Sequence, residues 1–381
     1  MSLRVDVRRR LGAFSLDATF ETGGRLTALF GPSGSGKTSL VNLIGGLLRP
    51  DEGRIVADGR VLVDTASRKY VPKHKRRIGY VFQDARLFPH MTVGQNLHYG
   101  RFFTPASERY GDIDGVVDLL GIGHLLDRKP GLLSGGEKQR VAIGRALLAS
   151  PRLILMDEPL ASLDDRRKAE IMPYIERLRD ETKIPIVYVS HSVAEVARLA
   201  TDMVVLDQGK VAAAGPTSEL LQRLDLLPAE ERGEGGAVLE MRVAGCNQAF
   251  GMSTLVSPAG EIHIVGLDAE PGSTVRVRIR ARDVIVATER PHGLSALNIL
   301  PGRIIGVSAG NGLFADVLID CNGEVITARI TRQSAEMLCL TRGLDIFAVI
   351  KSVTFDQANT TRGTTDGTMR PEGTTGMEKV G

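Results

Sequence analysis

GPSGSGKT, at residues 31–38, is the stretch that decides the fold of this chain. It fits the pattern G-x-x-x-x-G-K-[ST] in full, follows the apolar run RLTALF, and precedes a run with helical spacing at 40–48. Glycines let successive backbone N–H groups turn inward around phosphate groups, and the positive end of the next helix points at the same anion. The stretch therefore predicts a P-loop that binds a nucleoside triphosphate.

The loop also predicts how the phosphates are held. We expect Lys37 to add a mobile positive charge and the Thr38 hydroxyl to ligate Mg²⁺. A Gly/Ser-rich loop with a chance lysine is the alternative, and the flanking strand and helix patterns disfavour it. The expected nucleotide-binding residues of the loop are Gly31, Pro32, Ser33, Gly34, Ser35, Gly36, Lys37, Thr38 and Ser39.

A second apolar run, RLILM, ends in Asp157 and Glu158. Ligands gather at the C-terminal tips of strands in α/β sheets, so we expect both carboxylates at the site. Asp157 would hold Mg²⁺ directly or through water, and Glu158 would polarise the water that attacks the γ-phosphate. The alternative is a solvated acidic pair in a loop.

Short apolar runs alternate with helical patterns over the first part of the chain, which predicts an α/β domain. Pro173 falls inside one helical pattern and either kinks that helix or marks its first turn. A polar stretch, PAEERGEGG, then reads as a linker, and short β-rich runs after it indicate a small all-β barrel. The strands expected in the α/β domain are 25–30, 77–82, 152–156, 184–190 and 202–207.

Composition narrows the function. The chain has 381 residues, a net charge of +3, and 4% aromatic residues with no Trp, which argues against a nucleic-acid partner. The N-terminus does not read as a signal peptide, and no run approaches the ~18 apolar residues of a spanning helix. Any role at a membrane is therefore expected to come through a partner. Three scattered cysteines suggest reduced thiols.

The string LLSGGEKQR, at 132–140, resembles the signature of ABC-type ATPases through Ser134, Gly135 and Gly136, followed by Gln139. Other elements of that family follow in the expected order. Gln83 in YVFQDARLFP resembles the Q-loop glutamine, Asp164 in LASLD resembles the D-loop aspartate, and His191 after IPIVYVS resembles the switch histidine.

The resemblance implies roles for these residues. Glu158, His191 and Gln83 would be catalytic, and Thr38, Gln83 and Asp157 would hold Mg²⁺ beside ATP. Because this family completes each nucleotide site with the signature of a second cassette, and we see one cassette without an internal repeat, a head-to-tail homodimer is implied. The signature residues Ser134, Gly135 and Gly136 would then close on the partner's nucleotide, with Ser134 and Gly136 serving its γ-phosphate. Asp164, as the D-loop aspartate, is also expected among the nucleotide-binding residues.

The cassette closely resembles the ATP-binding subunits of molybdate importers, through the strings GYVFQDARLFPHMTVGQNLHYG and LSGGEKQRVAIGRALLASPRLILMDEPLASLD. The C-terminal part resembles the small molybdate-binding barrel of the Mop/TOBE type, through the strings LSALNILPGRI, ITARITRQSAEML and FAVIKSV. An arginine often stands in that barrel where this chain has Leu297, so a barrel that only helps the dimer to pair stays an alternative to one that binds molybdate as a feedback brake. The oxyanion-binding residues implied are Ser295, Asn298, Ser334 and Lys351.

The resulting fold prediction is an α/β P-loop NTPase cassette with a helical subdomain, followed by a small all-β, OB-like barrel. The predicted division is a cassette at 1–227 with its helical subdomain at about 85–150, a linker at 228–237, the barrel at 238–357 and a disordered tail at 358–381.

The function implied is an ATPase subunit that energises import of molybdate, or tungstate, at the cytoplasmic face of the cell (inner) membrane. Its partners would be integral-membrane permease subunits, contacted near Phe88, Pro89 and Met91, and through them an extracytoplasmic molybdate-binding protein. Sulfate, iron, polyamine and sugar importers share the cassette and remain alternatives. A soluble ABC ATPase that acts on DNA or ribosomes would need an inserted coiled coil, tandem cassettes or a strongly basic surface, and the sequence shows none of these. An oxyanion sensor with a vestigial ATPase is disfavoured by the intact Lys37, Asp157, Glu158 and His191.

Overall fold

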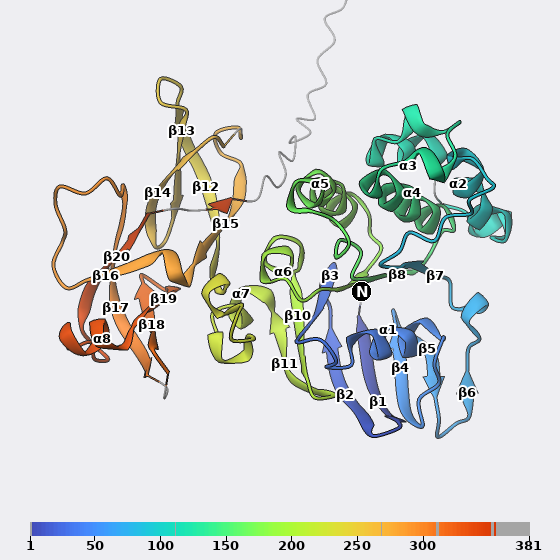
Figure 1. Ribbon diagram of the computed structural model, residues 1–381, viewed down its shortest axis with the longest axis horizontal. Helices are drawn as coiled ribbons and strands as arrows, with labels where there is room; N and C mark the ends of the chain where they lie inside the picture. The colour runs from blue at the N-terminus through green and yellow to red at the C-terminus, as the bar shows by residue number, and fades with distance from the viewer. Residues whose placement is uncertain (1, 111, 268, 310–311, 352–353, 356–381) are drawn as a thin grey trace, which may run out of the picture.

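A computed structural model of the protein describes residues 2–110, 112–267, 269–309, 312–351 and 354–355. Figure 1 shows an α/β part at the N-terminal end of the chain and an all-β part toward the C-terminal end. The tail predicted at 358–381 lies outside the described residues.

The α/β part is built on one sheet in the order β6-β5-β4-β1-β2-β11-β10-β3-β9-β8-β7. Its neighbours β10, β3, β9, β8 and β7 pair in parallel, and β3 and β9 are buried along their whole length. Strands covered on both faces read as continuous apolar runs, which is why the sequence predicted all five. They are β3 (Leu26–Phe30), β7 (Ile78–Val81), β8 (Leu153–Asp157), β9 (Ile186–Val189) and β10 (Asp202–Asp207).

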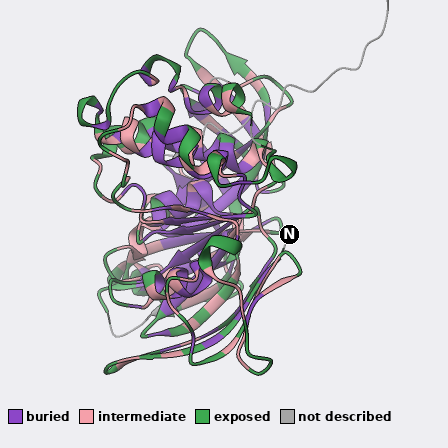
Figure 2. Cartoon of the chain, turned by 90° about the vertical axis from the view of Figure 1, so that its right-hand side faces the viewer, coloured by how far each residue is buried: buried purple, intermediate pink, exposed green. Residues whose placement is uncertain are grey.

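The other half of this sheet is largely antiparallel and had not been predicted. In β1 the exposed and buried residues alternate, because one face of the strand packs on the core and the other meets solvent. Figure 2 shows the buried residues concentrated in the central strands of the molecule. The added strands are β1 (Leu3–Leu11), β2 (Phe14–Thr22), β4 (Glu52–Ala57), β5 (Arg60–Asp64), β6 (Lys69–Tyr70) and β11 (Lys210–Pro216).

Helices cover this sheet and form the separate helical unit of Figure 1, which contains α2, α3 and α4. Side-chain caps fix where several helices begin: Thr92, Asp112, Ser134 and Asp164 each accept a hydrogen bond from the backbone N–H three residues on. Pro173 lies in the middle of α5 rather than in its first turn. The helices are α1 (Lys37–Gly45), α2 (Val93–Phe102), α3 (Ile113–Leu120), α4 (Gly135–Leu148), α5 (Asp165–Glu181), α6 (Val193–Leu199) and α7 (Thr217–Leu220).

The all-β part contains two five-stranded sheets, in the orders β14-β13-β12-β15-β21 and β16-β20-β17-β18-β19. Apolar residues of both sheets share one core, so the two sheets form a single unit. The fold class predicted from the sequence is confirmed. The elements are β12 (Gly236–Asn247), β13 (Met252–Ser257), β14 (Gly260–Val265), β15 (Thr274–Arg280), β16 (Val284–Ala287), β17 (Asn298–Ala309), β18 (Phe314–Cys321), β19 (Glu324–Thr331), α8 (Arg332–Met337), β20 (Asp345–Ile350) and β21 (Thr354–Phe355).

Among the residues that the structure describes, no helix combines the length and the apolar composition needed to cross a bilayer.

Candidate nucleotide-binding site

The predicted P-loop connects β3 to α1, and its backbone is shaped for an anion. Gly31, Gly34 and Gly36 adopt positive φ angles of 148°, 80° and 104°. A Cβ on Gly31 would come within 2.1 Å of the Leu206 carbonyl oxygen, so only glycine fits there. In the described part of the chain, the N–H groups of Gly34, Gly36 and Thr38 have no recorded hydrogen-bond acceptor. Unpaired N–H groups at a helix start form an anion-binding surface.

Lys37 is folded back onto this loop. Its Nζ donates to the carbonyl oxygens of Gly31 and Pro32, both at 2.8 Å, and the residue is only 5% exposed. Burial lowers the pKa of Lys37, while the neighbouring carboxylates of Glu158 and Asp157 act in the opposite direction. The ammonium group is therefore held beside the place where phosphates would bind.

Thr38 and Asp157 meet across the loop. The Thr38 hydroxyl donates to Asp157 Oδ1 at 3.2 Å, and the Tyr80 hydroxyl lies 3.4 Å from Asp157 Oδ2. Burial raises the pKa of Asp157, helped by the charge of Glu158 and opposed by the Thr38 hydrogen bond. Burial also raises the pKa of Tyr80, so the phenol stays a neutral donor. A hydroxyl and a carboxylate in this arrangement are hard oxygen ligands suited to Mg²⁺.

Glu158 follows directly after β8 and has a left-handed backbone with φ of 47°. Such a conformation is uncommon for a residue other than glycine and is found at functional sites. His191 follows the neighbouring strand β9, and its Nδ1 lies 3.6 Å from Glu158 Oε1. The structure thus brings Lys37, Thr38, Asp157, Glu158 and His191 to one edge of the parallel strands.

The remaining predicted nucleotide residues lie elsewhere. Gln83 is exposed just after β7, and Gln139 Nε2 of α4 donates to the neighbouring Phe82 carbonyl at 3.2 Å. Ser134 and Asp164 are exposed helix caps, and a Cβ on Gly135 would meet the Leu163 side chain at 2.9 Å. Residues 134–136 and Asp164 therefore lie beside one another. Across the described residues, no hydrogen bond or ion pair joins them to the P-loop of their own chain.

The four predicted oxyanion residues do not form one site within this chain. Asn298 pairs with Ile350 at the start of β17, so it lies close to Lys351, and Ser295 precedes it in an exposed loop. The Asn298 side chain bonds the backbone of His263 through both ends of its amide, at 2.7 and 3.2 Å. Ser334 lies just after β19. The end of β19 pairs with the start of β18, which in turn pairs with the end of β17. Ser334 is therefore at the opposite end of β17 from Asn298.

Two residues of the site were missed by the sequence reasoning. Tyr80 reaches both Asp157 and Asn42 Oδ1, the latter at 3.1 Å, and stacks on Phe82 with ring centroids 4.1 Å apart. Glu195 accepts hydrogen bonds from the Tyr188 and Ser190 hydroxyls at 2.9 and 2.8 Å, and Ser190 directly precedes His191 in the chain. A polar residue inside an otherwise apolar strand was the available signal for Tyr80.

Comparison with known proteins places this geometry in a family. Residues 15–161 match the ABC transporter family model, and residues 294–354 match the TOBE domain model. The molybdenum import ATP-binding protein ModC of Mesorhizobium japonicum is 68% identical over 95% of this chain and 98% of its own length. The ModC protein of Rhizobium etli is 56% identical, over 93% of this chain and 100% of its own length.

A solved structure shares the cassette fold. It is cbiO1 of Clostridium perfringens, part of the ABC transporter complex cbiONQ, which is 27% identical and covers 60% of this chain and 96% of its own, with a TM-score of 0.50. ABC cassettes bind and hydrolyse ATP and work as dimers with membrane permease subunits. The chain belongs to the ABC transporter family, as one of its molybdenum import ATP-binding proteins.

Proposed function

We propose that this chain hydrolyses ATP to energise the import of molybdate through an ABC permease. The observation that supports this most directly is the convergence of Lys37, Thr38, Asp157, Glu158 and His191 at one edge of the sheet, in a chain 68% identical to a molybdenum import ATP-binding protein. Tungstate, a dianion of the same shape, would use the same route.

Mg²⁺ fits the residues present. Thr38 and Asp157 place a hydroxyl and a carboxylate 3.2 Å apart. Gln83 lies outside this pair, after the adjacent strand β7, and its amide oxygen would be a further ligand. In the described residues, no group of three acidic, histidine or cysteine side chains is arranged to hold a metal ion by itself, so the nucleotide phosphates would supply further ligands. When bound, the ion neutralises charge on the phosphates.

The residues of the chain would divide the work of hydrolysis. Lys37 and the P-loop N–H groups bind the phosphates and stabilise the charge that moves onto them. Glu158 accepts a hydrogen bond from the attacking water and orients it toward the γ-phosphate. His191, 3.6 Å from Glu158, contacts the same phosphate and holds the carboxylate's orientation.

Because the signature and the P-loop do not meet within one chain, two copies would close head-to-tail. Ser134, Gly135, Gly136 and Asp164 of each copy would then complete the partner's site. An aromatic cluster on the helical unit supports permease docking: Phe88 contacts Tyr99, Tyr99 contacts Phe103, and Phe102 is 80% exposed. Docking there places the subunit at the cytoplasmic face of the inner membrane, with molybdate delivered from an extracytoplasmic binding protein.

A regulatory role for the barrel, as a molybdate-binding unit, is part of this proposal. Ser295, Asn298 and Lys351 lie at one end of β17, so a regulatory molybdate held there would require Ser334 to come from a second copy. Leu297 in that loop is 59% exposed and offers no charge to an oxyanion. We propose the division into a cassette at 1–227, a linker at 228–237 and a barrel at 238–357.

The test is uptake of labelled molybdate by cells whose only copy of this chain carries Glu158→Gln. Loss of a general base lowers a rate by about 10²–10⁴-fold, so uptake should fall to background. Glu52→Gln, which removes an exposed carboxylate on β4, should leave uptake unchanged. Excess tungstate should compete with molybdate and excess sulfate should not. Undiminished uptake with Glu158→Gln, or equal competition by sulfate, would reject the proposal.

A further inference from the structure

Helix α6, Val193–Leu199, begins two residues after His191. Isolated helices of this length have little stability of their own, so tertiary contacts must fix its position. Those contacts come from three places: the neighbouring helix α5, the segment that precedes the barrel, and the barrel itself.

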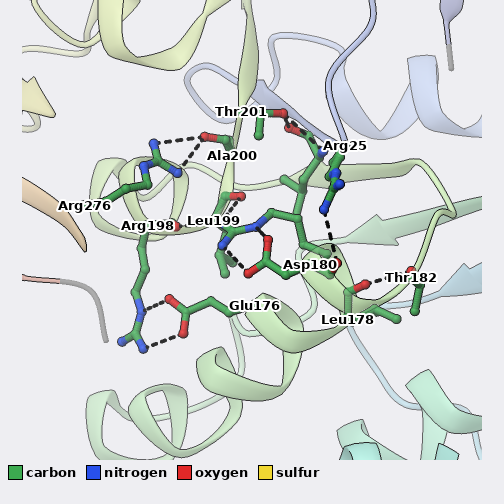
Figure 3. A network of polar contacts seen from close by, with 12 residues as sticks. Arg25, Glu176, Leu178, Asp180, Thr182, Arg198, Leu199, Ala200, Thr201 and Arg276 are labelled. Atoms are coloured by element: carbon green, nitrogen blue, oxygen red, sulfur yellow. Dashed lines mark hydrogen bonds and ion pairs between the residues drawn. The ribbon is translucent and has the colours of Figure 1, made fainter. Parts of the chain in front are cut away.

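Two ion pairs attach α6 to α5. Lys168 Nζ lies 3.1 Å from Glu195 Oε1, and Arg198 contacts both carboxylate oxygens of Glu176 at 2.7 and 3.0 Å. Glu176 and Glu195 are 2% and 6% exposed, so solvent screens these pairs little. Figure 3 shows the Arg198–Glu176 pair beside the end of α5.

Two arginines meet at the C-terminal end of α6, where carbonyl groups lack partners inside the helix. Arg179 of α5 donates to the carbonyl oxygens of Arg198 and Leu199 at 3.1 and 2.9 Å. Arg276 of β15 donates to the Ala200 carbonyl oxygen through both terminal nitrogens, at 3.5 and 3.4 Å. In Figure 3 the Arg276 guanidinium points at the Ala200 carbonyl oxygen. A strand of the barrel thus contacts the residue that caps the C-terminal end of this helix.

The N-terminal end of α6 is also touched from outside the cassette core. The Val193 N–H donates to Glu231 Oε2 at 3.4 Å, and Glu231 belongs to the segment that leads into β12. An acidic group near a helix N-terminus is favourable. Each end of α6 is therefore contacted from beyond the cassette, by Glu231 of the preceding segment at one end and by Arg276 of the barrel at the other.

Hydrogen bonds on both sides of His191 tie it to α6. Ser190 donates its hydroxyl to Glu195 Oε2 at 2.8 Å, and the Ser192 N–H donates to the Ser190 hydroxyl oxygen at 3.0 Å. Ser192 in turn caps α6 by accepting from the Glu195 N–H at 3.4 Å. Through these bonds a displacement of α6 would be passed to the residues on both sides of His191.

We propose that α6 couples the barrel to ATP hydrolysis, and that Arg276 is a positioning residue that sets the place of His191. This rests on the proposed role of His191. Charge-assisted hydrogen bonds usually measure about 2.7–2.9 Å, so the Arg276 contacts with the Ala200 carbonyl oxygen, at 3.5 and 3.4 Å, are long. Apolar packing of Val238 and Ala281 in the cassette core holds the barrel in place independently. A small shift of the barrel can therefore release α6 without detaching the barrel.

The test measures steady-state ATP hydrolysis by the full chain with Arg276→Gln, Arg276→Lys and Arg242→Gln. Arg242 is an exposed arginine on the adjacent strand β12 and serves as the matched control. Misplacing a group by ~1 Å can cost up to ~100-fold in rate, so we expect kcat to fall about tenfold with Arg276→Gln. The KM for ATP should change by less than about twofold, because the P-loop is untouched. Arg276→Lys should restore most of kcat, and Arg242→Gln should behave as the original chain.

Amide exchange followed by mass spectrometry provides a second measurement, with faster exchange expected across 193–200 in Arg276→Gln and unchanged exchange in α1. Unchanged kcat, a parallel rise in KM, or equal loss with lysine and glutamine would overturn the proposal. If Arg276→Gln does not fold, Glu231→Gln tests the other end of α6 with the same expectation. A parallel His191→Ala variant separates the two claims. Full ATP hydrolysis by His191→Ala would refute the role of His191. Lost hydrolysis in His191→Ala together with normal hydrolysis in Arg276→Gln would refute only the coupling through α6.

Discussion

Lys37 illustrates what the site does at the scale of a single residue. Its ammonium group is buried, where a lone cation is costly, and it is kept there by two carbonyl oxygens at 2.8 Å and by nearby carboxylates. Burial lowers the pKa of Lys37, and the charges of Glu158 and Asp157 partly restore it. A phosphate group can replace the carbonyl partners with a full negative charge, which makes the residue ready for nucleotide.

Replacing Lys37 by alanine should therefore remove a charged clamp on the phosphates. We expect hydrolysis to fall by about 10³-fold, in line with the loss of other preorganised donors at sites of developing charge. Phosphate release by the purified chain measures this rate. Lys69→Ala, which removes an exposed lysine of β6, is the control and should retain full activity. Retained hydrolysis in Lys37→Ala would refute the role of the lysine.

Individual residues were predictable where position along a strand decided them. Glu158 and His191 follow adjacent parallel strands, so their proximity could be inferred from the apolar runs before them. The sequence marks Tyr80 only as a polar residue in an apolar strand, because its contact with Asp157 depends on how a side chain reaches across two neighbouring strands. Asn298 could not be judged, because its amide binds the backbone of His263, which is distant in the sequence.

At the scale of elements, burial decided which strands could be predicted. The five parallel strands are continuous apolar runs, whereas β1 reads LRVDVRRRL, with charged residues on its exposed face. Period-two patterns with so many arginines are easily taken for loops. The sequence also left Pro173 open, and the structure places it in the interior of α5.

Pro173 has no N–H to donate to the carbonyl of Ala169, one turn earlier. Replacing it by alanine restores that donor, and proline costs up to about 3 kcal/mol relative to alanine inside a helix. We expect Pro173→Ala to raise the thermal unfolding temperature, measured by circular dichroism or calorimetry. Glu170→Ala, at an exposed position of the same helix, should change it little. A lower unfolding temperature for Pro173→Ala would mean that packing of the proline ring outweighs the missing hydrogen bond.

At the scale of the whole molecule, the two proposed halves of the nucleotide site lie apart within one chain. The phosphate-binding half lies on the parallel strands, and the signature half lies where α4 begins, at the exposed Ser134. Within the described residues these halves share no recorded hydrogen bond or ion pair. This division was implied by the family resemblance and could not be deduced from periodicity, because a contact between copies leaves no pattern in one chain.

Bound ATP should therefore join two copies, since each nucleotide would be covered by the signature of the other chain. The expected outcome for Glu158→Gln, which would bind ATP and hydrolyse it slowly, is a stable dimer in Mg-ATP, with twice the mass of one chain by size-exclusion chromatography with light scattering. Adding Ser134→Arg places a bulky side chain at the α4 N-terminus and should return the protein to a monomer while nucleotide binding persists. The Glu158→Gln variant without Ser134→Arg should also be monomeric when no nucleotide is present. A monomer of Glu158→Gln in saturating Mg-ATP would count decisively against shared sites, and dimers that survive Ser134→Arg would place the contact elsewhere on the molecule.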